Sequence, residues 1–488
     1  MPFITKYLSR ITMYRLTVFV LSAYLVIAVI RGFLGVLPFD PWDIIFQTIF
    51  LLFVCHLANK IFSKLLSAVS NTDSTTITAL ILALIVGPVA FLGQAAFLTL
   101  TAFFAIGSKY FLTIRKRHIF NPAGFAVVLI ALSGKFGASW WVGSYPLFPI
   151  VLLGGLLVLA KIKRFTMVAT FFAIYLGLSY LFGIGTTSLA FYTPLVFFAT
   201  IMLVEPLSSP VETKKQLAYS VLVAGVYVFF QEFSRVGYAL ELSLIIGNLF
   251  FYLLSSPFRT TLTLKRRERL ARGTFAFRFT KDTPFTFSPG QFMYWTLPHK
   301  SVDQRGIRRY FTISSSPTEK EVFIAVRIPE DSPSSFKKTL KILKKGEKII
   351  AMDVAGDFML PKDPKTPLVF IAGGIGITPF ASMAKWLLDK NEKRNIVILY
   401  ANPKKEEVAF EALLKEAEKA GVKTHFIFSE KDGHIDQKMI QGKVPDFRKR
   451  TFYISGPQAM VGKLSRLVSK MGAKKVKTDF FPGYTETY

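Results

Sequence analysis

The sequence predicts three parts in series: a polytopic α-helical membrane domain of about ten spans over residues 1–257, an antiparallel β-barrel domain over 258–362, and an α/β doubly wound domain over 363–488. Three observations predict them. Residues 1–256 hold only seven acidic residues, and long apolar runs fill that half. Short alternating runs separated by polar turns follow Thr260. After Pro367 a buried strand leads through a glycine-rich turn into a helix.

The composition narrows the class of protein. The formal net charge is +29. The basic residues cluster in loops between apolar runs and accompany no nucleic-acid fold motif, so we expect membrane lipid, and no nucleic acid, as a partner. Cys55 is the single cysteine, and an iron–sulfur cluster needs about four thiolates. No metal site is expected, and the sequence names no protein partner.

The membrane domain is predicted from ten apolar runs and from the charges between them. Basic residues follow every second run, whereas Arg31, Lys135 and Arg235 stand alone in the alternate loops. The positive-inside rule therefore predicts a multi-pass protein of the cell inner (cytoplasmic) membrane, with both termini and the charged half on the cytoplasmic side. The runs lie at about 13–35, 42–62, 76–92, 93–112, 120–134, 146–160, 165–183, 189–206, 216–232 and 237–256.

Three polar segments border these runs: residues 73–80, residues 116–122 with Asn121-Pro122, and residues 205–210, which begin Glu205-Pro206. In that order they make residues 70–255 resemble a family of flavin-binding membrane subunits, found in the Rnf electron-transport complex and in the sodium-pumping NADH:quinone reductase. The resemblance implies electron transfer across the bilayer and leaves open a second flavin in the membrane domain. Ser139 stands near the position of the threonine that carries FMN in the family, without the residues that precede it.

Heme is the rival membrane carrier. A transmembrane ferric reductase or NADPH oxidase has a similar layout, but only His56 and His118 lie in this half, and two stacked hemes need about four axial ligands. We expect His56 to be a polar packing residue that bonds between helices. Buried acids in spans are costly, and a proton or sodium role for Glu241 stays open.

The charged half is predicted to contain two kinds of sheet. Alternating runs predict antiparallel strands at Thr274–Phe279, Gln291–Leu297, Tyr310–Ser314, Val322–Arg327 and Lys348–Val354. Apolar runs separated by helical stretches predict parallel strands at Leu368–Ala372, Asn395–Tyr400, Val422–Phe428 and Arg450–Ser455.

Five motifs occur along this half in a fixed order: Pro289–Phe292, Arg309–Thr312, Ala355–Phe358, Gly373–Gly376 and Ser455–Pro457. With them residues 260–488 resemble the ferredoxin–NADP reductase family. The resemblance implies FAD on the barrel, NADH or NADPH on the doubly wound sheet, and hydride transfer between them.

The resemblance assigns the FAD site to two segments, 309–312 and 334–335. Their residues are Arg309, Tyr310, Phe311, Thr312, Ser334 and Ser335. The chemistry suits each role, because a guanidinium offers a forked donor to pyrophosphate and hydroxyls ahead of a helix bind phosphate with the helix N-terminus. Phe311 is expected against the flavin ring. Thr312 is expected at the reacting edge of the flavin, as a catalytic residue.

The resemblance assigns the nicotinamide nucleotide to glycine-rich turns and their neighbours: Gly373, Gly374, Gly376, Thr378, Gly456, Pro457 and Phe481. The glycines let the backbone approach the pyrophosphate. Ser455 and Asp479 are the other expected catalytic residues. Ser455 replaces the cysteine of the family, and Asp479 replaces its usual glutamate, for which the resemblance implies a proton-relay role.

These residues lead to one leading interpretation. The chain is expected to be a membrane flavoprotein oxidoreductase that passes electrons from cytoplasmic NAD(P)H through FAD to quinone or a second flavin. Glu430, which follows Ser429 at a strand end, would repel a 2′-phosphate, so NADH is favoured over NADPH. The alternatives are a redox-driven ion-translocating subunit and a transmembrane reductase of an external acceptor such as ferric iron.

Overall fold

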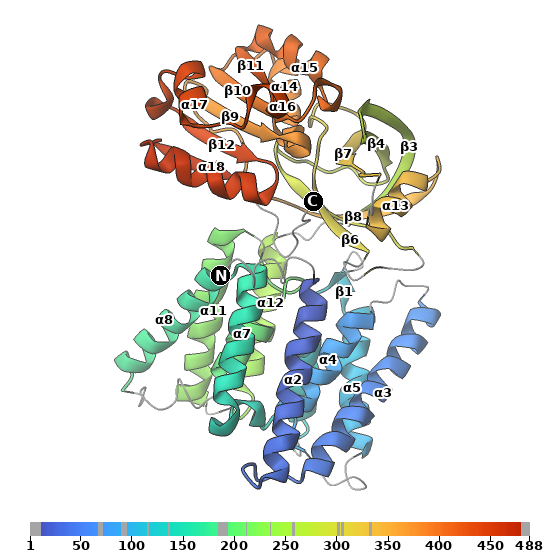
Figure 1. Cartoon of the computed structure of the whole chain (residues 1–488). Helices are drawn as coiled ribbons and strands as arrows, with labels where there is room; N and C mark the ends of the chain where they lie inside the picture. Colours follow the sequence, from blue (N-terminus) through green and yellow to red (C-terminus); the bar gives the residue numbers. More distant parts are fainter. Residues whose placement is uncertain are drawn as a thin grey trace. The chain divides into compact units, whose positions relative to one another are not determined.

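The structure is a computed structural model of the whole chain, and it forms two compact units, Met1–Pro257 and Phe258–Tyr488 (Figure 1). The residues it describes are 11–66, 72–88, 95–114, 117–134, 137–183, 194–210, 212–234, 236–255, 259–299, 303, 307–330 and 334–479. We call Met1–Pro257 the helical unit and Phe258–Tyr488 the reductase-like unit.

The helical unit is built from apolar helices with one small hairpin. The hairpin pairs β1 (Thr113–Ile114) with β2 (Arg117–His118). The helices are α2 (Met13–Phe33), α3 (Pro41–Leu65), α4 (Thr72–Ile85), α5 (Ala95–Phe111), α6 (Pro122–Ala131), α7 (Phe148–Ile162), α8 (Phe165–Leu181), α10 (Leu195–Phe197), α11 (Thr213–Phe229) and α12 (Ala239–Ser255), with short π-helical turns η3 (Phe198–Met202) and η4 (Phe230–Ser234).

The expected count of about ten spans is wrong for the described residues. Four helices there are long and apolar enough to cross a membrane: Met13–Phe33, Pro41–Leu65, Tyr145–Ile162 and Thr213–Ser234. Five other apolar helices have 10–17 residues. A run of apolar residues in the sequence can include residues that interrupt a helix, so the run is longer than the helix that forms. Thus α4 ends at Ile85, just before Gly87 and Pro88, and α6 begins only at Pro122.

The C-terminal end of α4 is capped by other parts of the unit. Trp141 Nε1 donates to the carbonyls of Ala83 and Val86, both at 3.0 Å, and Gln47 Nε2 donates to Val86 O at 2.9 Å. The backbone amides of Ser139 and Trp140 donate to Ile85 O at 2.9 and 3.0 Å. An apolar medium offers no water to such carbonyls, so these contacts allow a helix to stop inside the unit.

The first part of the reductase-like unit is a six-stranded antiparallel sheet, in the order β6-β5-β8-β3-β4-β7. Its strands are β3 (Arg259–Ala271), β4 (Thr274–Lys281), β5 (Phe292–Thr296), β6 (Arg308–Thr312), β7 (Val322–Arg327) and β8 (Lys348–Ala355). One helix, α13 (Ser335–Ile342), packs Phe336 and Leu340 into the core of this sheet. The five expected strands are present. The sequence did not predict β3, because its charged stretch at 265–269 hides an alternation that buries Leu262 and Leu264.

The second part is a five-stranded parallel sheet, in the order β11-β10-β9-β12-β13. Its strands are β9 (Leu368–Gly373), β10 (Ile396–Asn402), β11 (Val422–Phe428), β12 (Thr451–Ser455) and β13 (Lys475–Thr478). The turn η5 (Gly374–Ile377) leads from β9 into α14 (Thr378–Asp389). The other main helices are α15 (Glu411–Glu416), α17 (Gln437–Lys443) and α18 (Gln458–Lys470).

Helices cover both faces of this sheet, with α17 and α18 together at one side (Figure 1). Leu368 and Phe370 of β9 pack in one core with α14 and α15, whereas Val369 and Ile371 pack in a second core with α17 and α18. Alternate residues of a strand point to opposite faces, so this division shows the expected doubly wound arrangement. The strand order reverses between β9 and β12, where ligands of such sheets bind.

The barrel part and the parallel sheet are joined by hydrogen bonds within the reductase-like unit. Ser382 Oγ of α14 donates to Ser315 O, just beyond β6, at 2.7 Å. Tyr453 Oη of β12 donates to Met359 O at 2.7 Å. These contacts hold the end of the antiparallel sheet beside the glycine-rich turn.

Replacing Gly290 with alanine should destabilise this junction strongly. Gly290 has φ +92°, and a Cβ there would lie 2.1 Å from Phe358 O. We expect Gly290→Ala to lower the free energy of unfolding of this unit by about 2–5 kcal/mol, from backbone strain and the clash. Urea titration followed by hydrogen exchange of the β5 and β8 amides measures this.

Gly346→Ala is the matched control. Gly346 has φ +89°, but nothing lies within 4 Å of the place that a Cβ would take there, so only the strain of about 1–2 kcal/mol applies. Equal losses for the two variants would contradict the tight junction.

Candidate active site

The glycine-rich turn after β9 is pressed against the loop after β12. A Cβ on Gly376 would lie 2.6 Å from Gly456 Cα, and one on Gly373 would lie 2.4 Å from Met460 Sδ. The structure therefore brings the predicted residues Gly373, Gly376 and Gly456 together, and gives the first two a packing reason to be glycine. Gly374, at φ +53°, is half-buried and lies on the open side of the turn. Its contact with a nucleotide stays a prediction.

Two other predicted nucleotide residues flank this turn. Thr378 is the first residue of α14 and is buried. Pro457 is the N-cap of α18 and is exposed. The N-termini of two helices therefore point toward the same edge of the sheet, an arrangement that suits an anionic pyrophosphate.

The predicted catalytic pair is also in contact. Ser455 Oγ donates to Asp479 Oδ2 at 3.1 Å, and the Asp479 amide donates to Ile454 O at 3.0 Å. Removal from water raises the pKa of the Asp479 carboxyl to about 7, with Ser455 opposing the shift and Asp357 adding to it. A carboxyl that titrates near neutral pH, bonded to a hydroxyl, can hold and exchange a proton.

Arg309 and Ser335, which are predicted to bind the FAD phosphates, are linked by Asp303, a residue that the sequence did not single out. Buried Arg309 lies 3.9 Å from Asp303 Oδ1, and its guanidinium is 5.2 Å from the Phe336 ring. Asp303 Oδ2 accepts from the Ser335 amide at 2.8 Å. The carboxylate thus sits between Arg309 and the first residue of α13, which shows that this place suits an anion.

The neighbours of Ser335 complete this group. Ser335 Oγ accepts from the Asp303 amide at 3.0 Å and lies 2.9 Å from His299 Nε2. Ser334 is the buried N-cap of α13, and its hydroxyl accepts from the Lys337 amide at 3.3 Å. Asp303 and His299 could not be found from the sequence, because they stand in a polar stretch without a motif.

The flavin motif itself lies on β6, where successive side chains alternate in direction. Phe311 packs toward the core, with its ring 5.7 Å from that of Phe336. Tyr310, on the other side of the strand, is 4.4 Å from the Tyr294 ring. Thr312 is buried at the end of the strand. Which of these rings contacts a flavin stays a prediction, and Phe481 lies outside the described residues.

An ion pair joins the ends of the second and third strands of the parallel sheet. Lys404 Nζ lies 3.5 Å from Glu430 Oε2, and the Glu430 amide donates to Pro403 O at 3.4 Å. The sequence suggested only that Glu430 repels a phosphate. The structure pairs the two side chains at the surface.

In the helical unit the three polar segments singled out in the sequence meet at one place. Glu205 Oε2 accepts from Asn121 Nδ2 at 2.7 Å and from Ser208 Oγ at 2.9 Å, and His118 Nε2 lies 3.9 Å from Glu205 Oε1. We call these four residues the Glu205 cluster. Beside it lies a hollow of about 60 Å³ that is also lined by Ser74, Thr78 and Pro122.

Buried polar residues from other helices hold the Glu205 cluster in place. Asn248 Oδ1 accepts from the Asn121 amide at 2.8 Å, and Asn248 Nδ2 donates to Ser208 O at 3.0 Å and to Tyr219 Oη at 2.8 Å. Arg164 Nη1 donates to Val204 O at 3.2 Å. The sequence did not indicate Asn248 or Arg164, and Arg164 is only 3% exposed.

Two further polar side chains of the helical unit have specific partners. His56 Nε2 lies 3.0 Å from Thr76 Oγ1 on α4, the interhelical bond expected of a polar packing residue. Glu241 is buried at the start of α12, and Trp140 Nε1 donates to its Oε1 at 2.8 Å. Among the described residues no group of three or more His, Cys, Asp or Glu side chains could hold a metal ion.

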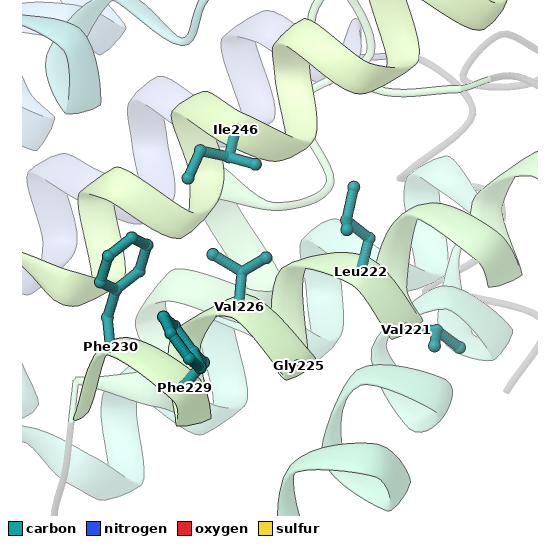
Figure 2. A pocket seen from close by; sticks show the side chains of 7 residues that line it. All are labelled: Val221, Leu222, Gly225, Val226, Phe229, Phe230 and Ile246. Atoms are coloured by element: carbon teal, nitrogen blue, oxygen red, sulfur yellow. The ribbon is translucent and has the colours of Figure 1, made fainter. Parts of the chain in front are cut away.

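A second hollow in the helical unit is apolar. It has a volume of about 460 Å³ and is lined along α11 and η4, with Ile246 of α12 above Val226 and Phe230 (Figure 2). Its other lining residues are Val221, Leu222, Gly225 and Phe229. No lining side chain can donate or accept a hydrogen bond, so the recess suits a lipid or isoprenoid chain.

The nucleotide-binding part of this site has a recognised family. Residues 370–466 match the oxidoreductase NAD-binding domain. This match covers the parallel sheet of the second unit, and the relatives of the chain include oxidoreductases.

Three relatives illustrate the likeness. Flavohemoprotein A from Dictyostelium discoideum is 27% identical over 39% of this chain and 51% of its own length. The NADPH oxidoreductase from Mycobacterium tuberculosis is 30% identical over 39% of this chain and 50% of its own. The glycine betaine monooxygenase reductase subunit from Chromohalobacter salexigens is 25% identical over 41% and 56%. The chain spans about half the length of these relatives.

A solved structure, the FAD/NAD-binding domain of nitric oxide dioxygenase from Vibrio cholerae, aligns at 19% identity and a TM-score of 0.41, over 46% of this chain and 98% of that one. The likeness of the helical unit to the membrane subunits of the Rnf complex and the sodium-pumping reductase stays a prediction.

The raised pKa of Asp479 should appear in the pH dependence of stability. Folded Asp479 keeps its proton up to about pH 7, whereas an unfolded aspartate releases it near about pH 3.9. The folded state binds more protons in between, so stability should fall as pH rises through this window, by about 1–3 kcal/mol.

Asp479→Asn removes the titrating group and should flatten this slope. Urea unfolding between pH 4 and 8, followed by hydrogen exchange of the β9 and β12 amides, measures it. An unchanged slope in Asp479→Asn would show that another group is responsible.

Proposed function

We propose that this chain is a membrane flavoprotein oxidoreductase that passes electrons from NADH, through FAD on the antiparallel sheet, to quinone at the helical unit. The observation that carries the proposal is the junction in the reductase-like unit. There the glycine-rich turn, the Ser455–Asp479 pair and the end of β6 are held together through α14, the Ser382–Ser315 bond and the packing of Gly376 on Gly456.

The residues present fit FAD. Arg309, the α13 N-terminus and Ser335 form a donor set that already holds a carboxylate, so it would bind the pyrophosphate in place of Asp303. FAD supplies the chemistry of taking up a hydride and releasing electrons singly. Thr312, at the end of β6, would orient the reacting edge of the ring.

The chain's own catalytic contribution is the Ser455–Asp479 pair. Ser455 is buried at the end of β12, beside Gly456 and opposite Gly376. Its hydroxyl would position the nicotinamide, while Asp479 fixes the hydroxyl and holds a proton near neutral pH.

Quinone is the favoured acceptor over a second flavin. The hollow beside the Glu205 cluster, about 60 Å³, is polar but too small for three fused rings. The apolar recess, about 460 Å³, is large enough but offers no hydrogen-bond partner to the polar edge of a flavin. A single quinone ring needs less space than three fused rings, and the Glu205 cluster offers hydrogen-bond partners for its oxygens.

Four helices long and apolar enough to cross a membrane support a membrane location. The alternation of basic loops favours the cell inner membrane, with both termini and the reductase-like unit on the cytoplasmic side. This orientation would bring the module to the pool of NADH.

Glu430→Ser should shift the nucleotide preference toward NADPH. The change removes the carboxylate that neutralises Lys404 and repels a 2′-phosphate. We expect kcat/KM for NADPH to rise by about 10-fold relative to NADH, equivalent to about 1.4 kcal/mol. Glu418→Ser, which removes an exposed acid elsewhere on the same domain, is the control. An unchanged preference would mean that the ribose does not reach this pair.

Glu205→Gln should separate the two half-reactions. NADH should still bleach the flavin at the wild-type rate, whereas quinone reduction should fall by about 10-fold or more. The amide oxygen can still accept from Asn121 and Ser208, but the negative charge is lost and an NH2 donor, in place of an acceptor, faces His118. Glu212→Gln, at an exposed pair with Lys215, is the control. Wild-type quinone reduction in Glu205→Gln would place the acceptor elsewhere.

The direct test of the proposed function is NADH-driven reduction of a water-insoluble quinone by the full chain in lipid vesicles. The proposal predicts turnover that depends on bound FAD. NADH oxidation with only soluble dyes as acceptors would contradict the role of the helical unit.

A further inference from the structure

Helix α13 has a strongly divided surface. Phe336 and Leu340, four residues apart, are fully buried in the core of the antiparallel sheet. Lys338, Lys341 and Ile342 lie at i, i+3 and i+4 on the exposed side. Ile342 is 74% exposed, and the other exposed large apolar side chains of the described residues all belong to the helical unit. A single exposed apolar side chain is ordinary by itself, so the charges around Ile342 decide what this surface can bind.

Further cations surround Ile342. Lys344 and Lys345 follow α13 and are exposed. Arg267 of β3 is exposed too, and its guanidinium donates to the Lys341 carbonyl, which fixes it beside the helix. We call this surface the basic ledge: Arg267, Lys338, Lys341, Ile342, Lys344 and Lys345.

Nearby acids do not neutralise the basic ledge. Glu347 is the one acid within residues 334–348, and its carboxylate accepts from the Lys344 amide at 2.7 Å. On the neighbouring strand Glu268 is paired with Arg266 and Arg278. Glu321 is paired with Lys265 and Arg266. The ledge therefore keeps a net positive charge around a protruding apolar side chain.

We propose that the basic ledge docks on anionic lipid headgroups, with Ile342 entering the interface between headgroups and acyl chains. Lysines on such a surface extend their charged ends to phosphates while their stems cover apolar contact. Clustered cations around an apolar tip are typical of segments that lie on anionic membranes. The inference rests on the proposed membrane location and adds a second attachment of the reductase-like unit, beyond its covalent link to the helices.

A probe at Ile342 tests the proposal in the full chain. Cys55 is the single cysteine and is fully buried, so Ile342→Cys can be labelled selectively with an environment-sensitive fluorophore. We expect the emission to shift to shorter wavelength, and to be quenched by spin-labelled lipid, in nanodiscs that contain phosphatidylglycerol. In nanodiscs of phosphatidylcholine alone, or in about 0.5 M salt, which screens such contacts, the probe should stay in water.

Matched charge reversals identify the surface. Lys338→Glu, Lys341→Glu and Lys345→Glu together should abolish the shift. Lys463→Glu, Arg466→Glu and Lys470→Glu, at exposed positions of α18 with the same change of charge, should leave it intact. If the α18 reversal abolishes the shift equally, the effect is one of net charge and the proposal is wrong.

Two other results would overturn the proposal. Shielding of the probe to the same extent in both lipids would mean that protein covers Ile342. A probe that stays in water in anionic discs would mean that nothing does. NADH bleaching of the flavin, recorded in the same discs, reports the proposed function separately, so either idea can fail without the other.

Discussion

The contact between two glycines, Gly376 and Gly456, sets the geometry on which the reductase-like unit depends. No Cβ fits at Gly376, because Gly456 Cα would be 2.6 Å away. The turn after β9 and the loop after β12 therefore meet backbone to backbone at the place where the strand order reverses. That approach places Ser455 beside the turn and leaves Gly374 on its open side, so two glycine-rich loops and one hydroxyl share a single edge.

A different constraint governs the helical unit, where backbone groups at helix ends must find partners inside the protein. The short helix α4 ends among Trp141, Gln47 and the amides of Ser139 and Trp140. Asn121 caps α6 by accepting from the Gly124 amide at 3.0 Å and also donates to Glu205. Broken helices thus bring polar groups into an apolar unit, and the Glu205 cluster is a direct consequence of such a break.

The fold of the reductase-like unit could largely be predicted from the sequence, because apolar and polar residues alternate along its antiparallel strands and its glycines occur in motifs. The expected strands and the parallel sheet are present, and β3 escaped because charges on its exposed side obscured the alternation. The motifs also named residues that the structure brings together at the sheet edge, among them Gly373, Gly376, Gly456 and the Ser455–Asp479 pair. Asp303 and His299 were not, since their roles depend on a meeting with Ser335 across 32 and 36 positions of the chain.

The helical unit was less readable. Hydropathy averages over Gly87, Pro88 and Pro122 and so overestimated the number of full-length spans. The three polar segments nevertheless meet, because Ser74, Ile77 and Thr78 line one hollow with Asn121 and Glu205. Asn248 forms hydrogen bonds with Asn121 and Ser208. The sequence around an asparagine in an apolar run does not indicate which other segments it contacts, so this role could not be predicted.

In the proposed function, electrons enter at one flavin on the antiparallel sheet and leave through the helical unit to quinone. The most direct measurement is the visible spectrum and flavin content of the full chain in nanodiscs, before and after NADH, followed by anaerobic addition of quinone. We expect one FAD per chain, bleached by NADH and restored by quinone, with no Soret band. A Soret band, a second flavin per chain, or a bleached flavin that quinone does not reoxidise would contradict this route.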